Sequence, residues 1–383
     1  MTTIKVLLKI SKFLFISLLS NLLFSFPDDI ETSLWVERHH LYKKSSIDSL
    51  IFEAFDNNIE NIYLQVRSRG DALYRSDIVS FNSNIESGFD PLEYSLMLAD
   101  LLNIKVHAWI NTYLIWSAEL PPDDDHLYYQ NPEWIDKPSK TLDSYLSKNI
   151  VYLSPNHPDV NIYIEKIVKE LIDNYPEIDG VHFDYIRNQN NNYGFNEMGI
   201  EVFENIYRFN PLNITSNHRE LGLTNFEKDS LTNIWNAYNQ NNITKLLREI
   251  RLYVNSFYPE ILLSAAVKPN PNEAKNRWSQ DWISWINNNI LDFVIPMNYG
   301  LDNHLFIDNL RRINKEILNI DKVVMGIAIY NQDEAAVAKK IILSKYSGFN
   351  KICLFSYNSL RKNNIDFNLI RYEYLNNKFI IED

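Results

Sequence analysis

Short runs that favour β-strands alternate with helical segments along most of this 383-residue chain. The strand-like runs are rich in β-branched and aromatic residues, whereas the segments between them repeat apolar residues at helical spacing. The strand-like runs lie at residues 33–38, 61–67, 104–110, 178–187, 261–267, 291–296, 322–329 and 351–356. This alternation predicts a parallel sheet covered by helices, because parallel neighbours need a crossover connection.

Eight strands favour a (β/α)8 TIM barrel, which needs about 250 residues. The helices between the strands are expected at 47–55, 91–102, 160–172, 281–288, 305–318 and 334–346. Long loops are then left after strands three and four. The second of them is an Asn-rich insertion from Asn188 to about Asn242, expected to be a loop with one or two helices, and a long helix towards Tyr258 is expected after it. A doubly wound sheet is the alternative, but the chain has no Gly-rich phosphate-binding motif to support it. We predict a single α/β TIM-barrel domain over residues 30–383.

The fourth strand places its apolar and polar residues on opposite faces. Val181 and Phe183 share one face, and His182 and Asp184 share the other. In a TIM barrel one face packs on the helices and the other points inwards, where polar groups belong near the carboxyl end. Asp184 stands at that end, so we predict that it is a site residue. An Asp that only caps the following turn is the alternative.

Other strands show the same separation of apolar and polar residues. Their inward set is predicted to be Trp35, Glu37 and His39; Tyr63, Gln65 and Arg67; His107, Trp109 and Asn111; and Ser264 and Lys268. Each of these side chains alone could be a packing residue or a salt-bridge partner. Together they predict a site at one end of the barrel, because burying so many polar groups is unfavourable without a function.

The first 26 residues have the layout of a secretory signal peptide. Three lysines precede an uncharged run at 13–26, and Pro27-Asp28-Asp29 follows directly. We expect cleavage near Ser25, or else retention of residues 1–26 as an N-terminal anchor that would be the protein's one contact with a membrane. A buried first helix is the alternative.

The amino-acid composition restricts the classes of molecule that the protein is expected to bind. The net charge is −12 and no basic stripe is visible, which argues against binding nucleic acid. Eight Trp and 23 Tyr suit stacking on sugar rings, although a large core also uses them. The single cysteine, Cys353, lies in an apolar run and cannot form an intrachain disulfide. We expect a monomer.

Several motifs concentrate in the first half of the chain. They are QVRSRGDALYRS at 65–76, FDPL at 89–92, HAWIN at 107–111, LSP at 153–155, HPDV at 157–160 and DGVHFDY at 179–185. These motifs closely resemble glycosyl hydrolase-like family ten, a group of bacterial envelope TIM barrels regarded as glycoside hydrolases. DFVIPMNY at 292–299 is similar to the strand-six pattern of that family, in which Gln often stands at the place of Met297. The Asn-rich insertion has no counterpart.

The resemblance implies a glycoside hydrolase of the periplasm or cell envelope that acts on a polysaccharide, expected to be peptidoglycan glycan without its peptides. Such enzymes use two carboxyl groups and no cofactor. Asp184 falls where retaining barrels related to the α-galactosidases carry their nucleophile. Asp71 and Glu37 are the candidates for its partner, and Asp71 is preferred because it lies in the best-matching motif. Ile186 occupies the place of the acid Glu of chitinases, which argues against substrate-assisted catalysis.

The residues expected to bind substrate combine hydrogen-bond donors with aromatic platforms. They are Arg67, Tyr74, His107, Trp109, Asn111, His182, Tyr185, Arg187, Lys268, Asn298 and Tyr299.

Two other functions stay open. A non-catalytic glycan-binding barrel would lack a second carboxylate within reach. A metal-dependent hydrolase would use His39, His40, His107 and His182 with Asp184, although such barrels carry a His-x-His pair on the first strand. We expect no metal.

Overall fold

The structure, a computed structural model, describes residues 30–124, 126–139, 149–216, 222–363 and 365–377. Within these residues eight parallel strands form one sheet in the order β8-β7-β6-β3-β2-β1-β10-β9. Their bounds are β1 Glu31–Val36, β2 Asn61–Arg67, β3 Lys105–Asn111, β6 Gly180–Asp184, β7 Leu262–Val267, β8 Phe293–Pro296, β9 Met325–Ala328 and β10 Lys351–Phe355. Parallel bridges from Val294 to Val323 and from Met297 to Gly326 connect β8 to β9. The predicted TIM barrel is confirmed.

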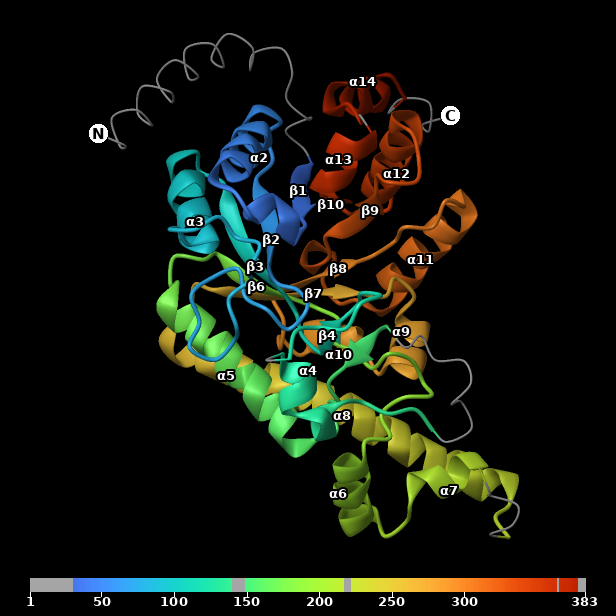
Figure 1. Ribbon diagram of the computed structural model, residues 1–383. Helices are drawn as coiled ribbons and strands as arrows, with labels where there is room; N and C mark the ends of the chain where they lie inside the picture. Colours follow the sequence, from blue (N-terminus) through green and yellow to red (C-terminus); the bar gives the residue numbers. More distant parts are fainter. Residues whose placement is uncertain (1–29, 125, 140–148, 217–221, 364, 378–383) are drawn as a thin grey trace.

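Helices surround the strands (Figure 1). They include α2 Lys44–Asp56, α3 Pro91–Leu101, α5 Pro158–Asn174, α8 Asn225–Phe257, α9 Pro271–Trp278, α10 Trp282–Asn287, α11 Asn303–Glu316, α12 Glu334–Tyr346, α13 Tyr357–Asn363 and α14 Phe367–Asn377. Side-chain caps start several of them. Asp90 caps α3 and His157 caps α5, and each helix has Pro in its first turn, where a missing N–H does no harm.

The packing confirms which side chains point into the barrel. Inside it, Trp35, Tyr63 and Trp109 form a cluster with Ala266, Ile295, Val324 and Cys353. The alternate residues of the strands, such as Ile62, Val106 and Phe183, belong to the much larger cluster shared with the helices. The predicted inward and outward faces are therefore correct, as expected for strands that alternate with period two.

One irregularity interrupts this alternation at the end of β2. The pairing with β3 shifts between Gln65 and Arg67, so that Gln65 pairs with Trp109 and Arg67 with Ile110. Such a bulge re-aims the side chains beyond it. Arg67 is completely buried as a result, and the loop that follows carries Ser68 and Arg69 to the barrel mouth.

The long loops after β3 and β6 contain structure of their own. The first holds a hairpin of β4 Leu114–Trp116 and β5 Val151–Tyr152 and the short helix α4 Leu127–Gln130. The second holds α6 Glu197–Tyr207 and α7 Pro211–Ser216, which lie away from the barrel beside the first part of α8 (Figure 1).

The Asn-rich insertion contains α6 and α7, in line with the one or two helices expected there, but the long helix that follows begins earlier than predicted. α8 starts at Asn225, well before Asn242, because Thr224 and Glu227 form a capping box there. Trp235 and Tyr238 on this early part of α8 pack against Phe203 of α6 in a separate aromatic cluster. The many Asn residues in this segment make the apolar face of the helix hard to recognise in the sequence.

The predicted signal peptide or anchor at 1–26 lies outside the described residues. Among the helices that the structure does describe, none has both the length and the apolar character needed to cross a membrane.

Candidate active site

A cleft of about 500 Å³, here called the barrel cleft, opens at the carboxyl ends of the strands. It is the end at which TIM-barrel enzymes hold their active sites. Its lining comprises Glu37, Arg38, His39, Gln65, Ser68, Arg69, Trp109, Asn111, Leu114, Ser117, Asp184, Tyr185, Arg187, Lys268, Met297, Tyr299 and Phe355. Most of these residues belong to a strand end or to the first few positions after it.

Asp184, the last residue of β6, lies buried in this cleft. Its Oδ1 accepts a hydrogen bond of 2.6 Å from the backbone N–H of Tyr185. Burial raises the pKa of Asp184, while Arg187 and Lys268 act in the opposite direction by favouring the carboxylate. The Trp109 indole also favours the charged form, although its Nε1 has no hydrogen bond of ordinary geometry to any described residue. Asp184 is therefore a desolvated carboxyl group with two cations nearby.

Glu37 is the second carboxylate in the barrel cleft, and together with Asp184 it completes the carboxylates among the described lining residues. It follows β1 directly and precedes a 3₁₀ helix at Arg38–Leu41. Its Oε2 accepts a hydrogen bond of 2.6 Å from the Ser356 hydroxyl, which follows β10. Two adjacent strand ends therefore position Glu37.

Asp71 lines a neighbouring hollow of about 340 Å³ and not the barrel cleft. Its Oδ1 accepts a hydrogen bond of 2.8 Å from the Arg69 N–H, and its Oδ2 accepts one from Asn82. These bonds hold the loop after β2, which is the ordinary role of an Asp after Gly. Of the two candidate partners, Glu37 therefore lines the barrel cleft with Asp184 and Asp71 does not.

Six of the predicted binding residues do meet in the barrel cleft: Trp109, Asn111, Tyr185, Arg187, Lys268 and Tyr299. The Arg187 guanidinium lies 5.0 Å from the centre of the Tyr185 ring, and Lys268 Nζ lies 4.7 Å from the Trp278 ring. Burial and the nearby Arg187 lower the pKa of Lys268 to about 8. The cleft therefore combines cations and aromatic rings around Asp184.

His107 and His182 point into the barrel but do not line the cleft, which corrects the prediction for both. Trp35 Nε1 donates a 3.2 Å hydrogen bond to His182 Nε2, so His182 Nδ1 carries the proton and donates to Ser264 Oγ at 2.9 Å. His107 stacks on Tyr63 with ring centroids 4.8 Å apart. Burial lowers the pKa of His107 to about 3 and lowers that of His182 well below its usual value. Both are neutral core residues, because they stand too far below the strand ends.

Arg67, Tyr74 and Asn298 are also buried away from the cleft, contrary to the prediction. Arg67 donates hydrogen bonds to the carbonyls of Asn111 and Thr112, the second at 3.4 Å. Tyr74 packs edge-on against Tyr175. Asn298 donates to the Phe306 carbonyl at 3.2 Å and accepts from Asn309 at 2.9 Å. All three stabilise the backbone or the core around the barrel mouth.

We expect Arg67→Ala to destabilise the protein by about 3 kcal/mol, because it opens a cavity and frees two buried carbonyls. Urea unfolding measures the change. Arg75→Ala is the control, since Arg75 is exposed on the same loop and should change the free energy of unfolding by less than about 0.5 kcal/mol. Equal stability of the two variants would contradict the supporting role of Arg67.

The histidines proposed as metal ligands do not converge. His39 lines the cleft and His40 does not; their rings lie 4.3 Å apart, and His40 also packs on Tyr357 at 4.6 Å. Within the described part of the chain, no three His, Cys, Asp or Glu side chains gather as a metal-ligand set. The geometry therefore gives no support to a metal-dependent hydrolase.

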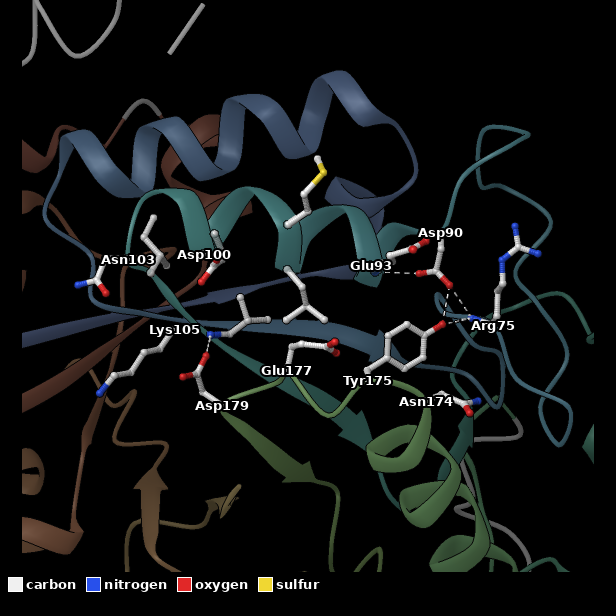
Figure 2. A pocket seen from close by; sticks show the side chains of 15 residues that line it. Arg75, Asp90, Glu93, Asp100, Asn103, Lys105, Asn174, Tyr175, Glu177 and Asp179 are labelled. Carbon is white, nitrogen blue, oxygen red and sulfur yellow. Dashed lines mark hydrogen bonds between the residues drawn. The ribbon is translucent and has the colours of Figure 1, made fainter. Parts of the chain in front are cut away.

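A larger hollow of about 800 Å³ lies near the opposite, amino ends of β3 and β6 (Figure 2). Two of its carboxylates, those of Asp90 and Asp179, hold the backbone and side chains around it. Asp90 accepts from the N–H of Glu93 at 3.0 Å and from the Tyr175 hydroxyl at 2.5 Å. Asp179 accepts from the N–H of Val106 at 2.7 Å. These contacts indicate a structural groove between α3 and the end of α5.

Sequence reasoning missed Arg38 and Arg69, which both line the barrel cleft and the neighbouring hollow. Arg38 is the last residue of the predicted first strand, but β1 ends at Val36 and Arg38 begins a 3₁₀ helix, which changes the direction of its side chain. Arg69 lies in the 65–76 motif, so the motif itself could have indicated it.

Comparison with known proteins agrees with this architecture. The family model described as Glycosyl hydrolase-like 10 matches residues 32–340. The chain is similar to the glycosyl hydrolase DigH of Escherichia coli O6:H1 (24% identity, covering 63% of this chain and 54% of DigH). It is also similar to the glycosyl hydrolase YngK of Bacillus subtilis (25% identity, covering 32% of this chain and 24% of YngK). The chain thus spans about half, or less, of the length of these relatives.

Solved structures share the fold at low sequence identity. The glycoside hydrolase domain of PgaB from Bordetella bronchiseptica matches with a TM-score of 0.69 at 12% identity, covering 89% of this chain and 98% of that domain. A β-galactosidase from Bacillus circulans matches with a TM-score of 0.56 at 14% identity, covering 86% of this chain and 50% of that protein. At such identities the likeness concerns the fold alone.

Proposed function

Since the chain belongs to the glycosyl hydrolase-like 10 family, we propose that it is a glycoside hydrolase whose reaction takes place in the barrel cleft. The observation that carries the proposal is the presence of Asp184 and Glu37 as the two carboxylates of that cleft among the described residues. A pair of carboxyl groups on either side of the bond is what glycoside hydrolysis requires. A non-catalytic glycan-binding barrel would not need the second one.

In the proposed mechanism Asp184 acts as the anion and Glu37 as the proton donor. The Arg187 and Lys268 cations stabilise the Asp184 carboxylate, which attacks the anomeric carbon or activates water. Glu37 protonates the departing glycosidic oxygen, and the Ser356 hydroxyl holds it in place. Trp109 and Tyr299 supply flat apolar surfaces for the sugar rings, while Asn111 supplies hydrogen-bonding groups.

We propose peptidoglycan glycan without its peptides as the substrate. Support comes from the family motifs of the first half of the chain and from a cleft that combines aromatic and polar groups. Purified protein should be incubated with intact and with peptide-free peptidoglycan, and the soluble products separated by chromatography. Release of oligosaccharides from the peptide-free glycan is the expected result. An absence of release from both materials would remove the support for this substrate.

The pH dependence should reflect the raised pKa of Asp184. Asp184 must be ionised to act as nucleophile or base, so kcat/KM should fall as the pH drops through its pKa in the free enzyme. Because burial raises that pKa above its ordinary value of 3.8, the acid limb should lie at a higher pH than for an exposed Asp. Initial rates between pH 3 and pH 8 would show it, and full activity down to about pH 3.8 would contradict the assignment.

We further propose that the protein is exported to the periplasm or cell envelope and acts there as a monomer. The layout of residues 1–29 supports export, and a cleft built from one chain needs no partner subunit. Protein recovered from the native envelope should begin after the 13–26 run. Mass spectrometry of the N-terminal peptide tests this, and recovery of Met1 would favour an uncleaved anchor.

A further inference from the structure

We propose that Arg38 and Arg69 form a carboxylate-binding subsite at the edge of the barrel cleft. This subsite would select glycans in which a sugar close to the cleaved bond carries a free carboxylate. The inference rests on the proposed glycosidase function and extends it, because it names the chemical group that is recognised and the residues that recognise it.

The charge of the barrel cleft is opposite to that of the whole chain. The chain has 37 Lys and Arg against 49 Asp and Glu. Among the described residues that line the cleft, four are basic (Arg38, Arg69, Arg187 and Lys268) and two are acidic (Glu37 and Asp184). Protonation of one carboxyl group for acid catalysis makes the cleft more positive still. A local surplus of cations in an acidic protein favours an anionic ligand.

Arg69 is held in place for such a ligand. Its guanidinium lies 5.6 Å from the centre of the Trp116 ring, and its Nε donates a 3.1 Å hydrogen bond to Ser117 Oγ. The two terminal nitrogens have no hydrogen-bond acceptor among the described residues. A stacked guanidinium with free terminal donors is preorganised to bind a carboxylate through two parallel hydrogen bonds.

Arg38 provides a second cation close to the first. Arg38 and Arg69 both line the barrel cleft and the neighbouring hollow, and burial and then Arg38 lower the pKa of Arg69, as expected for like charges near each other. The Arg38 side chain is 20% exposed, and its Nη1 lies 3.9 Å from Asp71 Oδ2, a separation longer than a hydrogen bond. One carboxylate therefore stands near two guanidiniums.

Asp71 accepts hydrogen bonds from the backbone N–H of Arg69 and from Asn82, and its Oδ2 lies 3.9 Å from Arg38 Nη1, so these contacts leave guanidinium donors of both arginines unused. A second anion between the guanidiniums would relieve their repulsion and use their unbonded donors. Arg38 and Arg69 line the barrel cleft and also the neighbouring hollow, so this anion would belong to a sugar beside the one at Asp184.

Peptide-free peptidoglycan glycan offers an anion of this kind. Every second sugar carries a lactyl ether, whose carboxylate is free only after the peptide amide has been removed. The subsite would thus distinguish glycan without peptides from glycan that still carries them, since the amide is neutral and accepts weaker hydrogen bonds than a carboxylate does.

The test compares two substrates of equal length: peptide-free glycan oligosaccharides, and the same oligosaccharides with each carboxylate converted to a methylamide. The full chain is used as wild type, Arg69→Gln, Arg38→Gln/Arg69→Gln and Arg75→Gln. For the wild type and Arg75→Gln, methylamide capping should lower kcat/KM about ten- to a hundredfold, as expected for the loss of charged hydrogen bonds. For the double variant, the two substrates should be cleaved at equal rates.

The outcomes separate this inference from the proposed function. If the wild type cleaves both substrates equally well, the subsite is refuted while the glycosidase function stands. If the wild type cleaves neither substrate, both the subsite and the proposed glycosidase function are refuted. If the double variant does not fold, the effect of methylamide capping is compared between the wild type and Arg69→Gln. An equal capping effect in these two proteins would overturn the role of Arg69.

Discussion

Replacement of Asp184 by Asn is expected to lower kcat by about four orders of magnitude or more, with little change in folding. The amide keeps the volume of the carboxyl group and can still accept the hydrogen bond from the Tyr185 N–H. It cannot form a covalent bond to the sugar or accept a proton from water. Kinetics on peptide-free glycan, together with a thermal melting curve, measure both effects.

The melting temperature of Asp184→Asn should stay constant or rise slightly at neutral pH. Burial raises the pKa of Asp184, so the folded protein binds its proton more tightly than the unfolded chain does. The ionised form, which dominates at neutral pH, therefore destabilises the fold, and Asn removes this effect. A variant that folds normally and retains more than about a tenth of the wild-type kcat would contradict the catalytic role of Asp184.

Replacement of Glu37 by Gln should lower kcat by about a hundred- to a thousandfold, the usual contribution of a general acid. Gln can still accept a hydrogen bond from the Ser356 hydroxyl, so the position of the side chain should be preserved. The loss should be smallest for substrates with a good leaving group, such as aryl glycosides, because these need little proton donation.

Asp71→Asn is the matched control for Glu37→Gln. Asp71 lies in the neighbouring hollow, where its hydrogen bonds hold a loop. Its replacement by Asn should therefore lower kcat by less than about tenfold. The reverse ranking, with Asp71→Asn nearly inactive and Glu37→Gln nearly normal, would restore Asp71 as the acid.

The fold was predictable from the sequence because its strands alternate apolar and polar residues with few exceptions. The alternation also gave the inward face correctly for Trp35, Tyr63, Trp109 and His182, all of which lie inside the barrel. It could not say how deep each residue lies. His182 stands two residues before Asp184 on β6 and contacts Trp35 and Ser264, not the cleft.

Two features of the site could not be predicted from the sequence, for physical reasons. The bulge at the end of β2 turned Arg67 into the core and brought Arg69 to the cleft, and nothing in the alternation of β2 signals that shift. Glu37 was named as a candidate, but its place in the cleft depends on Ser356, more than 300 residues later in the chain. Contacts between distant strands of a closed barrel are not visible in local sequence patterns.

The most direct test of the central claim follows the oxygen of water into the product. Peptide-free peptidoglycan glycan would be incubated with the protein in water enriched in ¹⁸O, and the released oligosaccharides analysed by mass spectrometry. Hydrolysis in the barrel cleft predicts one heavy oxygen at each new reducing end, and no product with Asp184→Asn. Fragments without the label, or equal release by Asp184→Asn, would contradict a hydrolysis that depends on this carboxylate.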